Sequence, residues 1–167
     1  IYPGQQFKVS QIAAIWDALE TAGVSGVTGV WKMLGGGHRF IDVVSIKQLF
    51  PGHAKMAGLI TAGCRDGAYM TRLIVIVDDD IDIENPAEVM WAISTRWDPK
   101  QQTDIIDGCW SAYIDPLITP EKRASGDITT SRMIIYAVRP FHQKDQFPKS
   151  YGITREYAAE LTAKWKS

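Results

Sequence analysis

A run of five apolar residues, Leu73 to Val77, leads directly into a stretch with five acidic residues between positions 78 and 84. The run does not alternate between apolar and polar residues, and such a run is typical of a strand buried on both faces in a parallel sheet. Carboxylates crowded at the end of a buried strand repel one another unless cations, a metal ion or solvent compensates them. The stretch therefore predicts an α/β protein and leaves open what neutralises Asp78, Asp79, Asp80, Asp82 and Glu84.

Helices and strands alternate along the rest of the chain. A first helix is predicted from an N-cap at Ser10 to a left-handed stop at Gly23, with apolar residues at helical spacing at Ile12, Ile15, Trp16 and Leu19. The stretches "GVTGVWKML" and "RFIDVVSI", joined by three glycines, predict two adjacent strands. After Pro51-Gly52, a helix rich in small residues is expected to approach a neighbour closely, either in the core or across a subunit boundary.

The second half of the chain contains further signals of this kind. Asn85, Pro86 and Glu88 form a capping-box pattern at the start of a helix, and "RMIIYAV" predicts a strand. The segment Asp98–Thr130 has three prolines and weak periodicity, so it is predicted as a long ordered loop. A C-terminal amphipathic helix is predicted on Tyr157, Leu161 and Trp165, which cover either a partner subunit or the domain's own core. We therefore predict one α/β domain over residues 1–167, with a mixed, mostly parallel sheet flanked by helices.

Net charge, apolar run length and cysteine spacing narrow the range of possible functions. A net charge of −1 over 167 residues gives no electrostatic grip on nucleic acid or on an anionic membrane. The apolar runs are too short to span a membrane, and Cys64 and Cys109 form no CxxC pair, which fits a reducing cytoplasm. The start at Ile1, in what reads as a loop, suggests a piece of a longer protein.

The residues alone support two interpretations of the acidic stretch. A strand followed by closely spaced Asp residues fits a magnesium-dependent phosphohydrolase of the haloacid-dehalogenase type, in which Asp78 and Asp80 would act on the phosphate and the metal. The alternative is a solvated strand-to-helix turn, with the negative charge favourable at the N-terminus of the helix that begins after Asn85. The turn is favoured, because nothing after Glu84 supplies the further acidic pair. The three histidines lack zinc spacing, and no nucleophile motif is present.

Four stretches together resemble the UbiD family of decarboxylases, which use prenylated FMN. They are "VVSIKQLFPGHAK", "AGCRDGAYMTRLIVIVDDDIDIENPAEVMWAISTRWDP", "GCWSAYIDPL" and "TTSRMIIYAVRPF", in the family's order, and the likeness extends from about Val9 to Pro148. The resemblance implies a C-terminal domain only. The prenylated FMN, Mn²⁺ and K⁺ sites, and the Glu–Arg–Glu group that transfers protons, belong to an N-terminal flavin domain that has no match here.

The same resemblance implies a role for this domain. It would close over the flavin, form one wall of the pocket for an aromatic or α,β-unsaturated carboxylic acid, and build a homo-oligomer, either a dimer or a larger assembly. The fragment alone would be inactive. A domain that serves assembly alone and never meets substrate remains the alternative.

Six residues are carried over from the family's motifs. Tyr69, Met70 and Arg72 fall where relatives place substrate-facing side chains, and Ala112 falls where relatives place a bulky or polar residue against the substrate ring. Arg65 is the nearest match to a basic residue that contacts the flavin in some members. Lys47 belongs to the "SIK" stretch and is either a cofactor contact or a support for the strand end. The resemblance also implies that the acidic stretch is structural or forms an interface.

Overall fold

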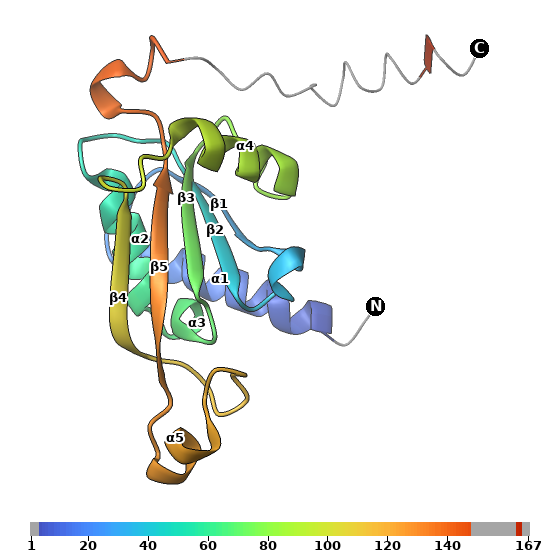
Figure 1. Cartoon of the computed structure of the whole chain (residues 1–167). Coiled ribbons are helices and arrows are strands. Elements are labelled where there is room, and N and C mark those ends of the chain that lie inside the picture. Colours follow the sequence, from blue (N-terminus) through green and yellow to red (C-terminus); the bar gives the residue numbers. More distant parts are fainter. Residues whose placement is uncertain (1–3, 148–162, 165–167) are drawn as a thin grey trace.

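Within the described residues, 4–147 and 163–164, five strands form one sheet in the order β1-β2-β3-β5-β4 (Figure 1). The structure is a computed structural model, and side chains are described from residue 9 onward. The helices and strands are α1 (Gly4–Thr21), β1 (Val27–Lys32), η1 (Leu34–Gly36), β2 (Ile41–Ile46), α2 (His53–Gly63), α3 (Arg65–Ala68), β3 (Leu73–Asp78), α4 (Pro86–Arg96), β4 (Thr103–Trp110), α5 (Pro120–Ser125), β5 (Thr129–Ala137) and η2 (Phe141–Gln143).

The sheet is mixed, as predicted. β2, β3 and β5 are parallel and form its centre, whereas β1 and β4 pair antiparallel at the two edges. In register, Val43 lies opposite Val75, and Val75 lies opposite Ile135, so the apolar run of β3 is buried between two similar strands. The uninterrupted apolar run thus marks the middle of the sheet, and the predicted α/β class is confirmed.

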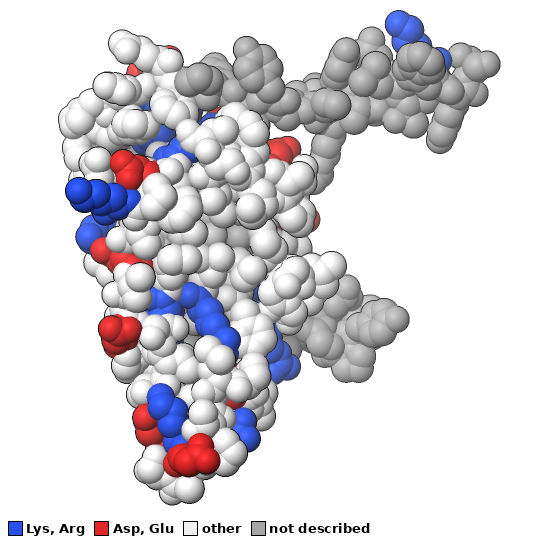
Figure 2. All heavy atoms as spheres, viewed as in Figure 1, with Lys and Arg blue, Asp and Glu red and all other residues white. Residues whose placement is uncertain are grey.

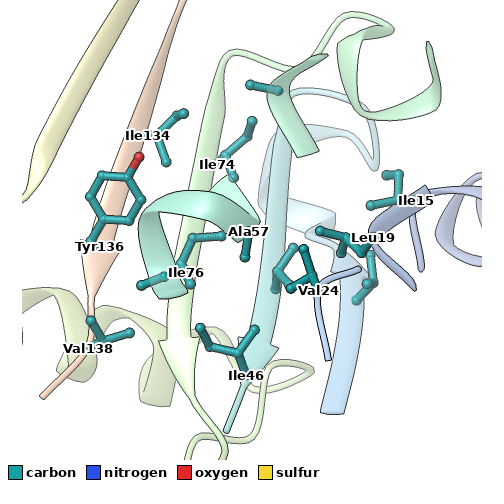
Figure 3. Close-up of a cluster of buried hydrophobic side chains, with 14 residues drawn as sticks. Ile15, Leu19, Val24, Ile46, Ala57, Ile74, Ile76, Ile134, Tyr136 and Val138 are labelled. Carbon is teal, nitrogen blue, oxygen red and sulfur yellow. The ribbon is translucent and has the colours of Figure 1, made fainter. Parts of the chain in front are cut away.

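Two apolar clusters, one on each face of the sheet, form the core. On the first face, Ile15 and Leu19 of α1 and Ala57 of α2 pack against the central strands (Figure 3). The strands contribute Ile46, Ile74, Ile76, Ile134 and Tyr136 to this cluster, and Val138 joins it just after β5. On the second face, Val89 and Ala92 of α4 pack against Val75 and Val77. Helices α1, α2 and α4 therefore bury their apolar sides against the sheet.

The small residues of α2 serve the core. A Cβ atom added at Gly58 would lie 2.7 Å from Cγ2 of Ile134 and 2.8 Å from Cε1 of Tyr136. The helix axis can lie this close to β5 because Gly58 has no side chain. Of the two predicted uses of these small residues, the structure shows the first, close packing within the domain.

Of three local predictions, one was wrong, one was right only in part, and one falls almost entirely outside the described residues. Helix α1 begins at Gly4, so Ser10 lies inside the helix and is not its N-cap. Asn85 does cap α4 and accepts a hydrogen bond from the Ala87 N–H, but Glu88 accepts from the Asp82 N–H, because the Asn85 N–H donates to the Asp82 carbonyl. The predicted C-terminal helix lies outside the described residues except for positions 163–164, which are helical.

The segment Asp98–Thr130, predicted as one loop, contains strand β4 and helix α5. The strand was hidden because it lies at an edge, and a register shift between Ile106 and Cys109 breaks its alternation of apolar and polar residues. Gly108 lies in that irregularity with a φ of +67°. Figure 2 shows acidic and basic side chains interspersed around α5, where Lys122 pairs with Asp127 at 3.3 Å. No helix in the described part of the chain is long and apolar enough to cross a membrane.

Lys32 and Asp42 form an ion pair inside the sheet. They lie opposite each other on β1 and β2, their Nζ and Oδ1 atoms are 2.8 Å apart, and both side chains are 0% exposed. Burial raises the pKa of Asp42 to about 6, although the Lys32 charge and a hydrogen bond from Thr71 partly offset it. The pair gives each charge its partner, but it offers no large net stabilisation over an apolar pair.

Arg132 lies on the same face at the start of β5 and is 2% exposed. Its Nη1 atom donates to the Ala62 carbonyl at 2.6 Å, and its Nη2 atom donates to the carbonyls of Ala68, at 3.2 Å, and Trp110. One guanidinium therefore binds the C-terminal ends of α2 and α3 and the end of β4, where carbonyl groups lack helical partners.

Replacing Lys32 alone is expected to destabilise the protein strongly. Lys32→Met leaves Asp42 buried without its cation and should lower the free energy of unfolding by about 3–5 kcal/mol. The double variant Lys32→Met/Asp42→Leu removes both charges and should recover most of that loss. Chemical denaturation of the three proteins tests this, and a double variant as unstable as the single one would contradict it.

His53 and Asp42 change the stability of the protein with pH in opposite directions, because burial lowers the pKa of His53 and raises that of Asp42. Its ring is 0% exposed and stacks on Phe50, and its Nδ1 atom accepts a hydrogen bond from the Leu49 N–H at 3.2 Å. Burial lowers the pKa of His53. The unfolded chain therefore binds the proton first, so the contribution of neutral His53 is present above pH 6.5 and is lost as the pH falls through the lowered pKa.

Replacing His53 should therefore flatten the acid side of the stability profile. Between pH 7.5 and 5.5 the wild-type protein should lose about 1 kcal/mol more stability than His53→Asn, which cannot titrate. Asp42 titrates in both proteins, so its effect cancels in the comparison. Urea denaturation at both pH values measures the difference, and parallel profiles would refute the assignment.

Candidate functional site

Two surfaces at opposite ends of the sheet carry the residues that the sequence singled out. The first, here called the acidic turn, comprises Asp78 to Glu84 and follows the C-terminal end of β3. The second, here called the substrate end, comprises Tyr69 to Arg72, just before β3, together with Ser111 to Leu117, after β4. The two are separated by the length of β3, about 17 Å.

Asp78 is the centre of the acidic turn. Its side chain is 2% exposed and accepts hydrogen bonds from Gln48 Nε2 at 2.7 Å, Arg96 Nη1 at 3.0 Å and the Arg139 N–H at 2.7 Å. The Nε atom of Arg139 adds a fourth contact at 3.2 Å. This carboxylate thereby connects the ends of β2 and β3 to α4 and to the residues after β5.

Asp80 shares Arg96 with Asp78. Both oxygens of Asp80 accept from the Arg96 guanidinium, at 2.7 Å each. Burial alone would raise the pKa of Asp80, but the hydrogen bonds and charge of Arg96 outweigh it and hold that pKa below its ordinary value. Asp79 is 38% exposed and has a longer contact, 3.7 Å, with Arg139. Arg96 and Arg139 therefore supply the positive charges beside Asp78, Asp79 and Asp80.

The phosphohydrolase alternative finds no support in this geometry. Asp78 and Asp80, its two candidate catalytic residues, both accept hydrogen bonds from Arg96. Among the described residues, no group of three or more His, Cys, Asp or Glu side chains is arranged to hold a metal ion.

At the substrate end, an ion pair joins the two segments that carry the predicted substrate residues. The Nη2 atom of Arg72 contacts Oδ1 of Asp115, whose side chain is 0% exposed. Asp115 also accepts from the Ser111 hydroxyl at 2.6 Å and from the Leu117 N–H at 2.9 Å. The Asp115 N–H donates to the Ala112 carbonyl at 2.9 Å, so the loop that carries Ala112 is fixed to the start of β3.

Aromatic side chains surround this junction. The Arg72 guanidinium lies 5.0 Å from the ring centre of Phe40, and the ring of Tyr69 lies 6.0 Å from that of Trp110 at an angle of 47°. Tyr69 is half-buried, whereas Met70 is 4% exposed and Ala112 is 7% exposed. The structure therefore brings Tyr69, Met70, Arg72 and Ala112 to the same end of the sheet.

The two candidate cofactor contacts do not come together. Arg65 is exposed and begins α3, at the substrate end. Lys47 is exposed beyond the C-terminal end of β2, beside the acidic turn, and lines a cavity of about 170 Å³ with Gln48, Asp79 and Arg139. Arg65 thus lies at the same end of the sheet as Tyr69, and Lys47 lies at the other end.

Several residues that build these sites were missed by the sequence analysis. Asp115 lies inside the quoted motif "GCWSAYIDPL", but its role depends on Arg72, which is 43 positions away. Lys32 and Asp42 are single charges in two otherwise apolar strands that were predicted to be adjacent, and that pattern is a signal for a buried pair. Arg96 lies in the last turn of a helix, where a basic residue is ordinary, so its pairing with the acidic turn was hidden.

A comparison with protein families identifies the class of protein. Residues 6–137 match the family described as the 3-octaprenyl-4-hydroxybenzoate carboxy-lyase C-terminal domain, UbiD_C. The match covers most of the chain and includes both the acidic turn and the substrate end. The chain belongs to this family, and the resemblance seen in its motifs is confirmed.

Solved structures show the same fold. The UbiD-class enzyme HmfF from Pelotomaculum thermopropionicum, in complex with FMN, is 24% identical with a TM-score of 0.77, over 93% of this chain and 33% of that chain. The 3,4-dihydroxybenzoic acid decarboxylase AroY from Klebsiella pneumoniae is 26% identical with a TM-score of 0.71, over 90% of this chain and 32% of that one.

Vanillic acid decarboxylase from Sedimentibacter hydroxybenzoicus has been solved in open and closed forms. The closed form is 24% identical with a TM-score of 0.67, over 92% of this chain and 31% of that chain. This chain therefore spans about one third of the length of the solved proteins that it matches.

The structure predicts that neighbouring aspartates in the acidic turn differ sharply in importance. Asp78→Asn exchanges an acceptor for a donor opposite Gln48, Arg96 and Arg139, and should cost about 3–5 kcal/mol of unfolding free energy. Asp79→Asn is the matched control, because the same change at an exposed carboxylate should cost about 0.5 kcal/mol or less. Thermal and urea denaturation measure both.

Activity measurements on the same kind of variant distinguish a structural role of the acidic turn from a catalytic one. In the complete enzyme, Asp79→Asn and Asp80→Asn should keep turnover, although Asp80→Asn should weaken folding. Loss of activity in either variant, with flavin content and assembly unchanged, would show that the acidic turn takes part in the reaction.

Proposed function

We propose that this chain is the C-terminal domain of a decarboxylase that acts without net oxidation on an aromatic or α,β-unsaturated carboxylic acid. The observation that carries the proposal is the Arg72–Asp115 ion pair, which fixes two motif segments of a carboxy-lyase family at one end of the sheet. The domain contributes one wall of the substrate pocket, and the remaining two thirds of the protein contribute the flavin-binding part.

Tyr69 and Ala112 shape this wall. A half-buried tyrosine ring beside Trp110 offers a flat aromatic surface to a planar acid. Ala112 has only a methyl group at a position where the family resemblance implies a larger side chain, and this leaves room for a larger ring or a ring substituent. Arg72 is committed to Asp115 and Phe40, so its first role is to hold the two segments together at the wall.

Prenylated FMN, when bound, supplies the reactive ring system on which the acid loses carbon dioxide. This chain's contribution is to orient the acid and to exclude water from it. Arg65, which is exposed at the same end of the sheet as Tyr69, is the candidate contact for such a cofactor. The open and closed forms of vanillic acid decarboxylase support a wall that moves as the pocket closes.

An exposed apolar surface supports contacts beyond this domain. Four large apolar side chains in or next to the loop after β4 are 45–61% exposed: Trp110, Tyr113, Ile114 and Leu117. Apolar side chains grouped in this way usually mark an interface. We assign this surface to the flavin domain or to a second subunit of a homo-oligomer. An assembly module that never meets substrate is the competing proposal, and it shares this surface.

Changing the size of Ala112 separates the two proposals. In the complete enzyme, Ala112→Leu should lower kcat/KM for acids with bulky ring substituents about tenfold or more relative to small acids, because the added atoms fill the space beside the ring. Ala124→Leu, in exposed α5, is the matched control and should leave the preference unchanged. An assembly module predicts the same substrate preference in both variants, provided that flavin content and oligomer size are normal.

A further inference from the structure

The segment Tyr69 to Arg72, which the proposed function places at the substrate pocket, has an unfavourable backbone conformation that other contacts must stabilise. Met70 has a φ of +64°, a left-handed conformation that non-glycine residues rarely adopt, and its side chain is 4% exposed. Tyr69 and Arg72, on either side of it, are the residues assigned to the pocket wall. Their directions depend on this turn, because a change of φ at Met70 would rotate the chain on both sides of it.

Thr71 connects the segment to the interior. Its side chain is buried, and its hydroxyl lies 3.0 Å from Oδ2 of Asp42 and 3.3 Å from the Arg39 carbonyl. The other oxygen of Asp42 accepts from Lys32 at 2.8 Å. The acceptor that faces Thr71 is therefore held in place by a cation that is itself fully buried.

The backbone on the β3 side is anchored separately. The N–H groups of Arg72 and Leu73 both donate to the Phe40 carbonyl, at 3.0 Å each. These bonds fix where β3 begins, but they do not reach the turn at Met70. Thr71 is the residue between the two, and its hydroxyl reaches the buried pair.

A buried ion pair is a costly way to fill a core, since apolar residues of similar volume are often at least as stabilising. Apolar residues could not accept a hydrogen bond at this position. The Asp42 carboxylate can, and Lys32 holds it in place. The donor of this hydrogen bond is the Thr71 hydroxyl, one residue from Met70.

We propose that Asp42, oriented by Lys32, is a positioning residue that sets the directions of Tyr69 and Arg72 through the Thr71 hydroxyl. This inference rests on the proposed function, because it assumes that the segment faces substrate. Asp42 and Lys32 touch neither substrate nor cofactor, and they act on the pocket wall from inside the sheet.

Thr71→Val in the complete enzyme is the direct test. The variant keeps the shape of the side chain and removes the hydroxyl, so kcat/KM should fall about tenfold, with most of the change in KM. Thr71→Ser restores a hydroxyl and should return kcat/KM to within about twofold of wild type. Hydrogen exchange of a peptide spanning residues 69–73 should be faster in Thr71→Val and near normal in Thr71→Ser.

Thr61→Val is the matched control. Thr61 is also fully buried, and its hydroxyl donates within α2 to the Ala57 carbonyl at 2.9 Å. Removing it deletes one buried hydroxyl without touching Asp42, so KM and exchange at residues 69–73 should stay at their wild-type values. If Thr71→Val does not fold, Thr71→Ala removes the same hydroxyl without placing a second methyl group next to a carboxylate.

The outcomes distinguish the positioning role of Asp42 from the proposed function of the domain. Equal kinetics and equal exchange in Thr71→Val and Thr61→Val would overturn the positioning role of Asp42. If Tyr69→Ala and Ala112→Leu still alter substrate preference in that case, the proposed function stands without the inference. If neither changes the preference, the proposed function fails as well. Faster exchange at residues 69–73 in Thr71→Val with unchanged kinetics would report a purely structural anchor and would also overturn the positioning role.

Discussion

The fold depends on a carboxylate that has been removed from water and given three partners. Asp78 ends the central strand, and it binds Gln48 beyond β2, Arg96 at the end of α4 and Arg139 beyond β5. Four pieces of chain that are distant in sequence therefore meet at one side chain. A buried charge that lost any one of these partners would carry an uncompensated cost of several kcal/mol, and this ties the pieces together more specifically than apolar packing does.

Buried charges also stabilise the opposite end of the sheet, but they have a different role there. There, charges occur in pairs that fix loops and turns: Lys32 with Asp42, and Arg72 with Asp115. The apolar strands between the two ends supply a rigid spacer, and the family motifs lie at both ends. The arrangement is what a pocket wall requires, because side chains that face a substrate must be fixed from behind.

Much of the fold could be predicted from local patterns. The apolar run of β3, the glycine-linked strands β1 and β2, and the cap at Asn85 each follow from short-range chemistry, and the structure shows all three. Strand β4 could not be predicted, because an edge strand with an irregular register and a positive-φ glycine shows no clean alternation. The start of α1 was misplaced because Ser10 looks like a cap in sequence but lies within a longer helix.

The candidate site was predictable only in part, for a physical reason. Motifs place Tyr69, Met70, Arg72 and Ala112 one by one, but the contacts that orient them depend on tertiary pairing. Arg72 meets Asp115 and Thr71 meets Asp42 across 43 and 29 positions of sequence, respectively. A pattern read along the chain reports which residues are charged, but it cannot report which opposite charge lies beside them in space. Lys47 shows the limit most clearly, since its motif is intact but the fold places it away from the substrate end.

Arg132 joins α2, α3 and β4, and its hydrogen-bond partners differ from those of the other buried cations. Its guanidinium is bound by main-chain carbonyls of Ala62, Ala68 and Trp110, and these oxygens do not take up protons at any pH that proteins tolerate. Because burial raises the pKa of Asp42 to about 6, the folded protein takes up this proton before the unfolded chain does, and the clasp between α2, α3 and β4 is unaffected. The Arg132 clasp therefore gives α2, α3 and β4 a junction whose hydrogen bonds do not change with pH, whereas the Lys32–Asp42 pair on β1 and β2 can take up a proton.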